Sequence, residues 1–326
     1  MKAEKVQLSV LMSVYNETLK DIAEAIESIL NQTFSNFELL IVDDNPSRLD
    51  HKNLLAEYKK KDSRIIILDN QKNIGLAMSM NKAAAKARSD IFVRMDADDI
   101  SLPTRFEEQY QLLRSNCYDL VCGRFTSIDE ASLDIGLNEI KPEYISSEEI
   151  AETLPYKSVI HHPTVMMTRA IFERVNGYRD FPCAQDYDLW LRMLDAKATF
   201  AMTNKTILKY RIRESSISGS KKIKQRLTIE YIRDRYIERL RKGKDSFSKE
   251  HYQNYLNKQI KNESKDSELI EQGNVILNYA KECEEHGKAL YSKLLKCKVL
   301  LCNRVYRHVF LKLWVSKIII KRLRQR

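Results

Sequence analysis

The sequence predicts an α/β fold, with a mostly parallel, doubly wound sheet, flanking helices and a helical C-terminal extension. Three observations lead to this prediction. Short apolar runs rich in β-branched residues alternate with helical patterns over residues 7–95, which is typical of strand–helix–strand units. Polar residues cluster where each predicted strand ends. From residue 221 onward, glycine and proline nearly vanish while Lys, Arg, Glu and Tyr dominate.

The N-terminal alternation can be followed element by element. The apolar run at residues 7–14 is interpreted as a buried strand, and Ile22, Ile26 and Ile29 then recur on one face of a helix. Further strands are predicted at residues 37–42 and 64–68 and from residue 91, with helices at 51–61 and 76–88 between them. Such alternation implies parallel strands, and ligands bind beyond their carboxyl ends.

The rest of the chain is less regular. Helices are predicted at residues 103–115, 169–175 and from Asp186, and strands at 118–125 and 207–212, with an apolar segment at 164–167. Residues 127–155 are expected to be irregular and surface-exposed. Beyond residue 220, helices are predicted at 221–242 and 265–326, joined by a polar linker at 243–262.

Composition limits the classes of protein that fit. The chain has 326 residues, of which 43% are hydrophobic, enough for a substantial core. Its net charge is +10 and is unevenly spread, because residues 304–326 hold eight Lys and Arg and no acid. Anionic lipid, a phosphate-bearing substrate and nucleic acid are all candidate partners. The six cysteines lack zinc-ligand spacing, and without a secretory signal we expect reduced thiols in the cytoplasm. No apolar window is long enough for a membrane span.

An acidic cluster ends the fourth predicted strand. The stretch IFVRMDADDI (residues 91–100) places Asp96, Asp98 and Asp99 directly after an apolar run. Crowded carboxylates are costly to desolvate, so the cluster favours a metal–phosphate site, although Asp99 alone is typical of a helix cap. A GxGxxG or GxxxxGK[ST] motif is absent, which disfavours a dinucleotide fold or a P-loop. We therefore expect a divalent cation to bridge these carboxylates and the phosphate groups of a substrate.

A second pair of acids begins a later helix. Asp186 and Asp188 stand in the first turn of an apolar-faced helix that carries Trp190. Acids in that position suit the helix dipole, so capping alone would explain one of them. The other is a candidate for chemistry.

The motifs together resemble family-2 glycosyltransferases of the GT-A fold, the type that builds bacterial O-antigen, capsule and lipopolysaccharide. The matching segments cover about residues 7–218 and are SVLMSVYNE (9–17), SILNQTFSNFELLIVDDNP (28–46), NIGLAMSMN (73–81), RMDADDISLP (94–103), Gly177-Tyr178 and AQDYDLWLR (184–192). The resemblance implies a Rossmann-like catalytic domain at residues 1–220. Its nucleotide-sugar half would span about 1–103 and its acceptor half about 104–220, before a basic helical region at 221–326.

The resemblance also implies a donor site. The expected contacts to the base and ribose of a nucleotide sugar, with a UDP-hexose as the default, are Tyr15, Asn16, Glu17, Asp43, Asp44, Asn73 and Gly75. Asp96-Ala97-Asp98 resembles the family's DxD motif. Asp98 would ligate Mn²⁺ or Mg²⁺ and Asp96 would contact the nucleotide. A hard cation with carboxylate ligands suits a diphosphate leaving group.

Asp186 matches the family's catalytic base, which takes the proton of the acceptor hydroxyl during a single inverting displacement. The family's neighbouring Glu is replaced by Gln185, a departure that could change acceptor contacts. Arg211 and Arg213 stand where many relatives have an Arg and a His, and Arg213 could bind phosphate. His162 and Arg211 are expected to contact the acceptor or the diphosphate. For His162, packing with His161 as a loop histidine near the acceptor cleft is the alternative interpretation. In this family a QxxRW motif accompanies processive polymerases. Because this sequence lacks it after the acid, we expect one sugar to be transferred per binding event.

The tail RVYRHVFLKLWVSKIIIKRLRQR (residues 304–326) combines eight Lys and Arg with large apolar residues and no acid. It fits an interfacial helix on anionic lipid, or a C-terminal helix packed on the domain with a solvated basic end. With the lipid-diphosphate-linked sugar acceptor that the resemblance implies, we expect a cytoplasmic protein peripheral on the inner face of the cell membrane.

Three other functions would require different sequence features. A nucleotidyltransferase on a related sheet should carry a Gly-rich loop with Arg and Lys after the first strand, where this chain has Tyr15-Asn16-Glu17. A nucleic-acid-binding protein should have a basic cleft, whereas the predicted strand edge is acidic. A membrane-associated, non-catalytic binding protein would not need Asp98 and Asp186.

Overall fold

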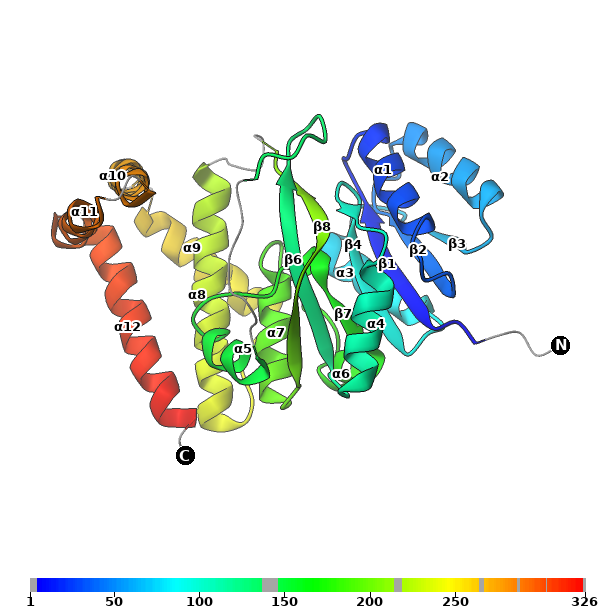
Figure 1. Cartoon of the computed structure of the whole chain (residues 1–326). Coiled ribbons are helices and arrows are strands. Elements are labelled where there is room, and N and C mark those ends of the chain that lie inside the picture. Colours follow the sequence, from blue (N-terminus) through cyan, green and yellow to red (C-terminus); the bar gives the residue numbers. More distant parts are fainter. Residues whose placement is uncertain are drawn as a thin grey trace. The chain divides into compact units, whose positions relative to one another are not determined.

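The fold was analysed in a computed structural model, which describes residues 5–136, 146–213, 219–263, 267–285, 288–302 and 304–324 (Figure 1). The chain divides into two units, Met1–Gln225 and Arg226–Arg326, and the boundary falls inside one helix. Part of the loop predicted at 127–155 lies outside the described residues, as do residues 214–218 at the end of the segment that carries the family motifs.

One mixed sheet organises the first unit. Its eight strands, among the residues described, run in the order β3-β2-β1-β4-β7-β6-β8-β5. They are β1 (Leu8–Val14), β2 (Phe37–Asp43), β3 (Ile65–Asp69), β4 (Ile91–Asp96), β5 (Ile100–Ser101), β6 (Leu120–Ile128), β7 (Met166–Thr168) and β8 (Phe200–Arg211). Strands β1 to β4 pair in parallel as predicted, whereas β7 is antiparallel to β4 and β6, and β5 is antiparallel to β8.

Helices flank this sheet (Figure 1). They are α1 (Leu19–Leu30), α2 (Leu49–Lys61), α3 (Leu76–Lys86), α4 (Arg105–Ser115), α5 (Ser147–Thr153), α6 (Arg169–Arg174) and α7 (Gln185–Asp195), with a 3-10 turn, η1, at His162–Thr164. Helix α1 starts where the Thr18 hydroxyl accepts the Asp21 N–H at 3.1 Å, and its apolar face is fully buried. Helix α5 corrects the prediction of an irregular, exposed segment, because Ser146 caps it and Ile150 and Leu154 are buried.

Strand register places the functional loops at one edge of the sheet. Val14 pairs with Asp43 and Ser13 pairs with Asp96, so β1, β2 and β4 end almost level with one another. All seven residues of β2 are buried, as expected for a strand covered on both faces. The polar residues that follow these three strands therefore share one rim.

The second unit is helical. Its helices are α8 (Gly219–Lys242, which crosses the unit boundary), α9 (Lys249–Glu263), α10 (Ser267–Glu285), α11 (Ala289–Cys302) and α12 (Arg304–Arg324). Helix α9 corrects the predicted linker at 243–262. Its polar sequence hides a narrow apolar face, with Tyr252 and Leu256 buried and the Tyr252 ring 5.2 Å from that of Tyr231. None of the described helices is long and apolar enough to cross a membrane.

Candidate active site

The loops after β1 and β2 are tied together by one amide. Asn45 Nδ2 donates to the Tyr15 carbonyl at 2.9 Å and to Asn16 Oδ1 at 3.0 Å. The Glu17 carboxylate accepts the Tyr15 N–H at 2.6 Å, and the Tyr15 side chain is exposed. Three residues predicted to contact the nucleotide sugar thus lie together at the rim. Asn45 positions their loop, a role that could not be predicted from the sequence.

Asp43 presents a buried acceptor oxygen at the same rim. Its Oδ1 accepts the Asn45 N–H at 3.0 Å, but its Oδ2 has no hydrogen-bond partner among the described residues. Burial raises the pKa of this carboxyl, with the Asn45 hydrogen bond opposing. A buried acceptor is costly to leave unpaired, so this oxygen suits a ligand's N–H or O–H donor.

Asp44, a predicted contact of the donor's base and ribose, holds the loop that leads into α3. Its Oδ1 accepts from Asn70 Nδ2 and the Ile74 N–H, both at 2.8 Å, and its Oδ2 accepts the Gly75 N–H at 2.9 Å. Gly75, at φ +82°, needs this support where the chain enters α3, and Asn73 Oδ1 also accepts its N–H. Asp44 is buried, and these hydrogen bonds shape the loop at 73–75.

Three carboxylates meet after β4. Oxygen atoms of Asp96, Asp98 and Asp99 lie within 4.8 Å of one another. Burial and the neighbouring Asp96 raise the pKa of Asp98 to about 6, although Arg213 opposes the shift. Burial also raises the pKa of Asp99, whose Oδ2 has no hydrogen-bond partner among the described residues. These oxygen donors fit a hard divalent cation such as Mg²⁺ or Mn²⁺.

Asp99 is not the helix cap that its position suggested. Its Oδ1 accepts the Arg211 N–H at 2.9 Å, which joins the turn after β4 to the end of β8. Helix α4 begins only after Thr104 and has no side-chain cap.

Two buried arginines stand behind the carboxylates, and sequence reasoning missed both. The Arg94 guanidinium pairs with Asp96, and its side chain is 2% exposed. Arg94 Nε and Nη1 have no hydrogen-bond partner among the described residues. Arg105 Nη2 donates to the Arg94 carbonyl at 2.9 Å. The available signal was the spacing of Arg94 and Asp96, because residues two apart on a strand share a face.

Asp186 stands in the first turn of α7 and is half-buried. Loss of hydration raises the pKa of this carboxyl, while the Tyr187 N–H and Arg94 act in the opposite direction. Asp96 contributes to the same rise, so the site's two acidic groups lie close enough to interact. Just before Asp186, Ala184 adopts φ +56° and Gln185 is buried. Helix α7 therefore begins at Gln185, one residue before the acid.

Asp188 lies in a buried ion-pair network. Its side chain is fully buried and pairs with Arg192 Nε at 2.8 Å and with Arg179 Nη1 at 3.5 Å. This ion pair fixes α7 from inside the unit.

His162, a predicted acceptor or diphosphate contact, packs among other side chains of the first unit. His162 is buried, its Nε2 lies 2.7 Å from the Tyr178 hydroxyl, and its ring centroid is 6.1 Å from that of Trp190. Burial lowers its pKa well below the usual value, with Arg94 adding to the effect. A neutral core histidine in this setting holds Tyr178. His161 packs against Phe125, and burial lowers its pKa as well.

The two arginines after β8 differ in what they can offer. The Arg211 guanidinium is buried and donates to Glu24 at 2.7 Å and to the Asp98 and Asp129 carbonyls at 2.8 and 2.9 Å, so its hydrogen bonds are made within the protein. Arg213, partly exposed, bridges Asp98 at 3.0 Å and Asp21 at 2.9 Å. Arg213 lies directly on the carboxylate cluster.

Comparisons with known proteins agree with this geometry. The model of Glycosyl transferase family 2 matches residues 9–175. The O-antigen biosynthesis glycosyltransferase WbnJ of Escherichia coli is 34% identical over 216 residues, which cover 65% of this chain and 82% of WbnJ. The UDP-Glc:alpha-D-GlcNAc-diphosphoundecaprenol beta-1,3-glucosyltransferase WfgD of Escherichia coli is 30% identical and covers 66% of this chain and 80% of its own length.

A solved structure shows the same fold. S. aureus TarS 1-349, in complex with UDP-GlcNAc, superposes with a TM-score of 0.57 at 16% identity, covering 77% of this chain and 70% of its own. A longer TarS chain is covered to only 42%. The likeness confirms the predicted GT-A fold.

Proposed function

Because the chain belongs to glycosyl transferase family 2, with homologues in surface polysaccharide biosynthesis, we propose that it is an inverting enzyme that moves one sugar from a nucleotide sugar to a lipid-linked oligosaccharide. The observation that carries the proposal is that Asp43 and the carboxylates of residues 96–99 lie at one sheet edge, with Asp186 near enough to feel the charge of Asp96. A UDP-hexose is the default donor, in keeping with the UDP-Glc in the name of WfgD. Family membership leaves the nucleotidyltransferase and non-catalytic alternatives without support.

The donor's base and ribose would lie over the loops after β1 and β2. The free oxygen of Asp43 would accept a donor group of the base, and the exposed Tyr15 ring offers a stacking surface. Asn16 and Glu17 border the same space. Asp44 contributes indirectly, through the loop at Asn73 and Gly75 that it holds.

A divalent cation, Mn²⁺ or Mg²⁺, would be held by Asp98, with Asp96 contacting the nucleotide. When bound, the cation would offset the charge of the departing diphosphate as a Lewis acid. Arg94 fixes the Asp96 carboxylate from behind. Arg213 is the proposed diphosphate contact, since its partly exposed guanidinium already lies beside Asp98.

Asp186 would act as the base. The acceptor oxygen attacks the anomeric carbon and its proton passes to Asp186, while the bond from that carbon to the diphosphate oxygen breaks. The nucleoside diphosphate leaves with the bonding electrons, and the anomeric centre inverts. The raised pKa of Asp186 makes it a stronger base than an ordinary carboxylate. Gln185, next to it, is the proposed acceptor contact.

The acceptor would be presented at a membrane. The name of WfgD includes a diphosphoundecaprenol-linked sugar, which supports a lipid-linked acceptor here. Helix α12 carries Lys and Arg, exposed Phe310 and Trp314, and no acid. We place this helix on the anionic inner face of the cell membrane, with the enzyme peripheral and cytoplasmic.

The test is a panel of nucleotide sugars, offered with Mn²⁺ and a synthetic lipid-diphosphate sugar, to wild-type protein and the Asp98→Ala variant. We expect transfer from one donor class and loss of metal-dependent donor binding in the variant. Asp50→Ala, an exposed acid on α2, is the control and should behave as wild type. No transfer from any nucleotide sugar would overturn the donor class. Unchanged metal-dependent donor binding by Asp98→Ala would show that another residue ligates the metal.

A further inference from the structure

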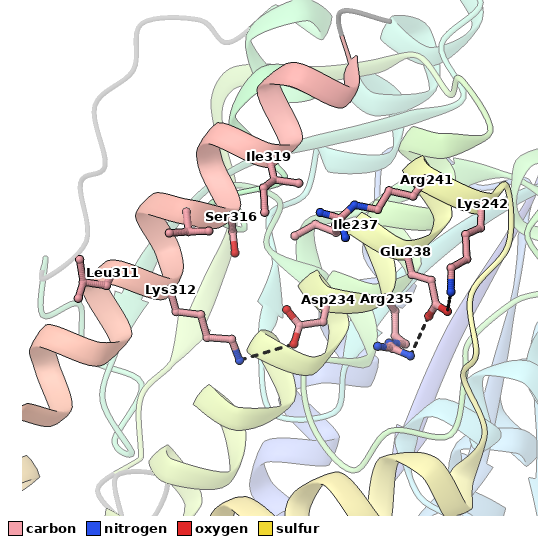
Figure 2. A pocket seen from close by; sticks show the side chains of 11 residues that line it. Asp234, Arg235, Ile237, Glu238, Arg241, Lys242, Leu311, Lys312, Ser316 and Ile319 are labelled. Atoms are coloured by element: carbon pink, nitrogen blue, oxygen red, sulfur yellow. Dashed lines mark hydrogen bonds and ion pairs between the residues drawn. The ribbon is translucent and has the colours of Figure 1, made fainter.

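A groove lies between α8 and α12 of the second unit (Figure 2). Its volume is about 690 Å³. Small-molecule sites commonly enclose about 300–1,000 Å³, so the groove is large enough for a ligand. Its apolar walls come from both helices: Ile237 from α8, and Leu311, Val315 and Ile319 from α12.

The apolar wall of the groove continues onto the outer surface of α12. Leu311 and Val315 line the groove yet remain 50% and 46% exposed. Beside them, Phe310 and Trp314 are also exposed, Trp314 to 55%. Contiguous exposed apolar side chains mark interaction surfaces, and tryptophan suits a boundary between apolar and wet surroundings. A hydrocarbon chain in the groove would therefore be continuous with this outer strip.

The charged lining favours an anion. Lys312 Nζ lies 3.5 Å from Asp234 Oδ2, and Arg235 Nη1 and Lys242 Nζ lie 2.8 and 3.3 Å from the Glu238 carboxylate (Figure 2). Both acids of the lining are thus neutralised. Arg241 is exposed and has no hydrogen bond or ion pair among the described residues. One guanidinium at the groove is therefore available to a ligand.

We propose that this groove binds one anionic phospholipid of the bilayer, with an acyl chain between Ile237, Val315 and Ile319 and the phosphate on Arg241. The inference rests on the membrane attachment in the proposed function. An amphiphilic ligand would contact both the apolar walls and Arg241. A free phosphate would leave the apolar walls uncovered, and an uncharged hydrocarbon would leave Arg241 unused. A bilayer lipid is favoured because the exposed strip of α12 forms one wall.

The experiment measures binding of short-chain phosphatidylglycerol, kept below its micelle concentration, to the full-length protein by native mass spectrometry and calorimetry. Wild type should bind one molecule saturably. Arg241→Gln should weaken binding about tenfold or more, because a charge-assisted hydrogen bond is lost. Val315→Asp should weaken it as well by placing a carboxylate in the apolar wall. Lys244→Gln is the matched control: it removes the same charge outside the lining and should bind as wild type.

Chemically related probes distinguish a phospholipid from other possible ligands of the groove. Short-chain phosphatidylcholine and glycerol 3-phosphate should bind more weakly than phosphatidylglycerol. Equal weakening by Arg241→Gln and Lys244→Gln, or no saturable binding, would overturn the proposal. Preferential binding of polyprenyl phosphate or of polyglutamate would also overturn it. Sugar transfer to a soluble acceptor is measured in parallel. If sugar transfer is intact but the lipid does not bind, only the lipid-binding proposal for the groove is refuted. If the lipid binds but no sugar is transferred, only the proposed glycosyltransferase function is refuted.

Discussion

The sheet-edge site and the outer surface of α12 in the second unit differ in how they place charged and apolar side chains. At the sheet edge, ionisable groups are buried and held by one another, as in the Arg94–Asp96 and Asp188–Arg192 pairs. In the second unit, cations lie at the surface of α12 beside exposed Phe310 and Trp314. The first arrangement fixes positions for chemistry, and the second suits adhesion to a surface.

The contrast implies different sensitivities to mutation. Removing one partner of a buried ion pair leaves an uncompensated charge, whereas exposed pairs contribute little. Exposed apolar side chains add little to folding but determine what the surface binds. Substitutions at the sheet edge should therefore affect catalysis and stability, and substitutions on α12 should affect location.

The largest expected effect is on catalysis. Asp186→Asn should lower the rate of sugar transfer by about 10²–10⁴-fold, because the general base is lost, and leave donor binding largely intact. Transfer of radiolabelled sugar under single-turnover conditions measures the rate. Asp195→Asn, at the far end of the same helix, is the control. Full activity of Asp186→Asn would place the base elsewhere.

The next effect is on stability. Arg94→Leu should lower the free energy of unfolding of the first unit by about 3–5 kcal/mol, because Asp96 loses its buried partner. Urea unfolding followed by the fluorescence of buried Trp190 reports on this unit. Lys296→Leu breaks an exposed pair with Glu284 in the second unit and should leave the first unit's midpoint unchanged. Equal urea midpoints for wild type and Arg94→Leu would contradict the claim that this buried ion pair stabilises the first unit.

A smaller effect is expected at the membrane. The double variant Phe310→Ser, Trp314→Ser should bind phosphatidylglycerol-containing vesicles more weakly, since burying a large apolar side chain contributes about 1.5–3 kcal/mol. Co-sedimentation measures the bound fraction. Leu133→Ser, which alters an exposed leucine of the first unit, should bind like wild type. Undiminished binding by the double variant would remove α12 from the interface.

The smallest effect is a pH dependence. The folded pKa of His162 lies below the value of about 6.5 in the unfolded chain, so the unfolded state binds a proton that the folded state refuses. The free energy of unfolding should therefore fall as pH drops below about 6.5, by at most about 1.4 kcal/mol per pH unit from this group. His162→Gln should flatten that slope. An unchanged acid slope would show that other groups cause it.

Much of the donor half could be predicted from local patterns. Strand–helix alternation predicted the four parallel strands, and the polar residues after them do lie at one edge. The antiparallel placement of β7 and β5 could not be predicted, because local periodicity does not determine strand direction. Helix α9 was missed because its segment is mostly polar, and among the side chains that the structure describes there, Tyr252 and Leu256 are the buried ones.

The roles of individual acids were harder to predict than their grouping. Asp44 acts on Gly75, and Asp99 on Arg211, which lies 112 residues away. A carboxylate that supports the backbone and one that faces a ligand look alike in sequence. Only the partners distinguish them, and those partners come from distant segments. Arg94 is the exception, because its spacing from Asp96 was a usable signal.

The pairing of Arg213 with Asp21 and Asp98 also bears on how the protein folds. These contacts join residues 192 and 115 positions apart in the chain. Contacts between distant segments require the closure of long loops and slow the folding reaction. During synthesis, the carboxylate cluster would gain this arginine only after the first unit is almost complete. The rim of the site is therefore expected to be among the last parts of the unit to become ordered.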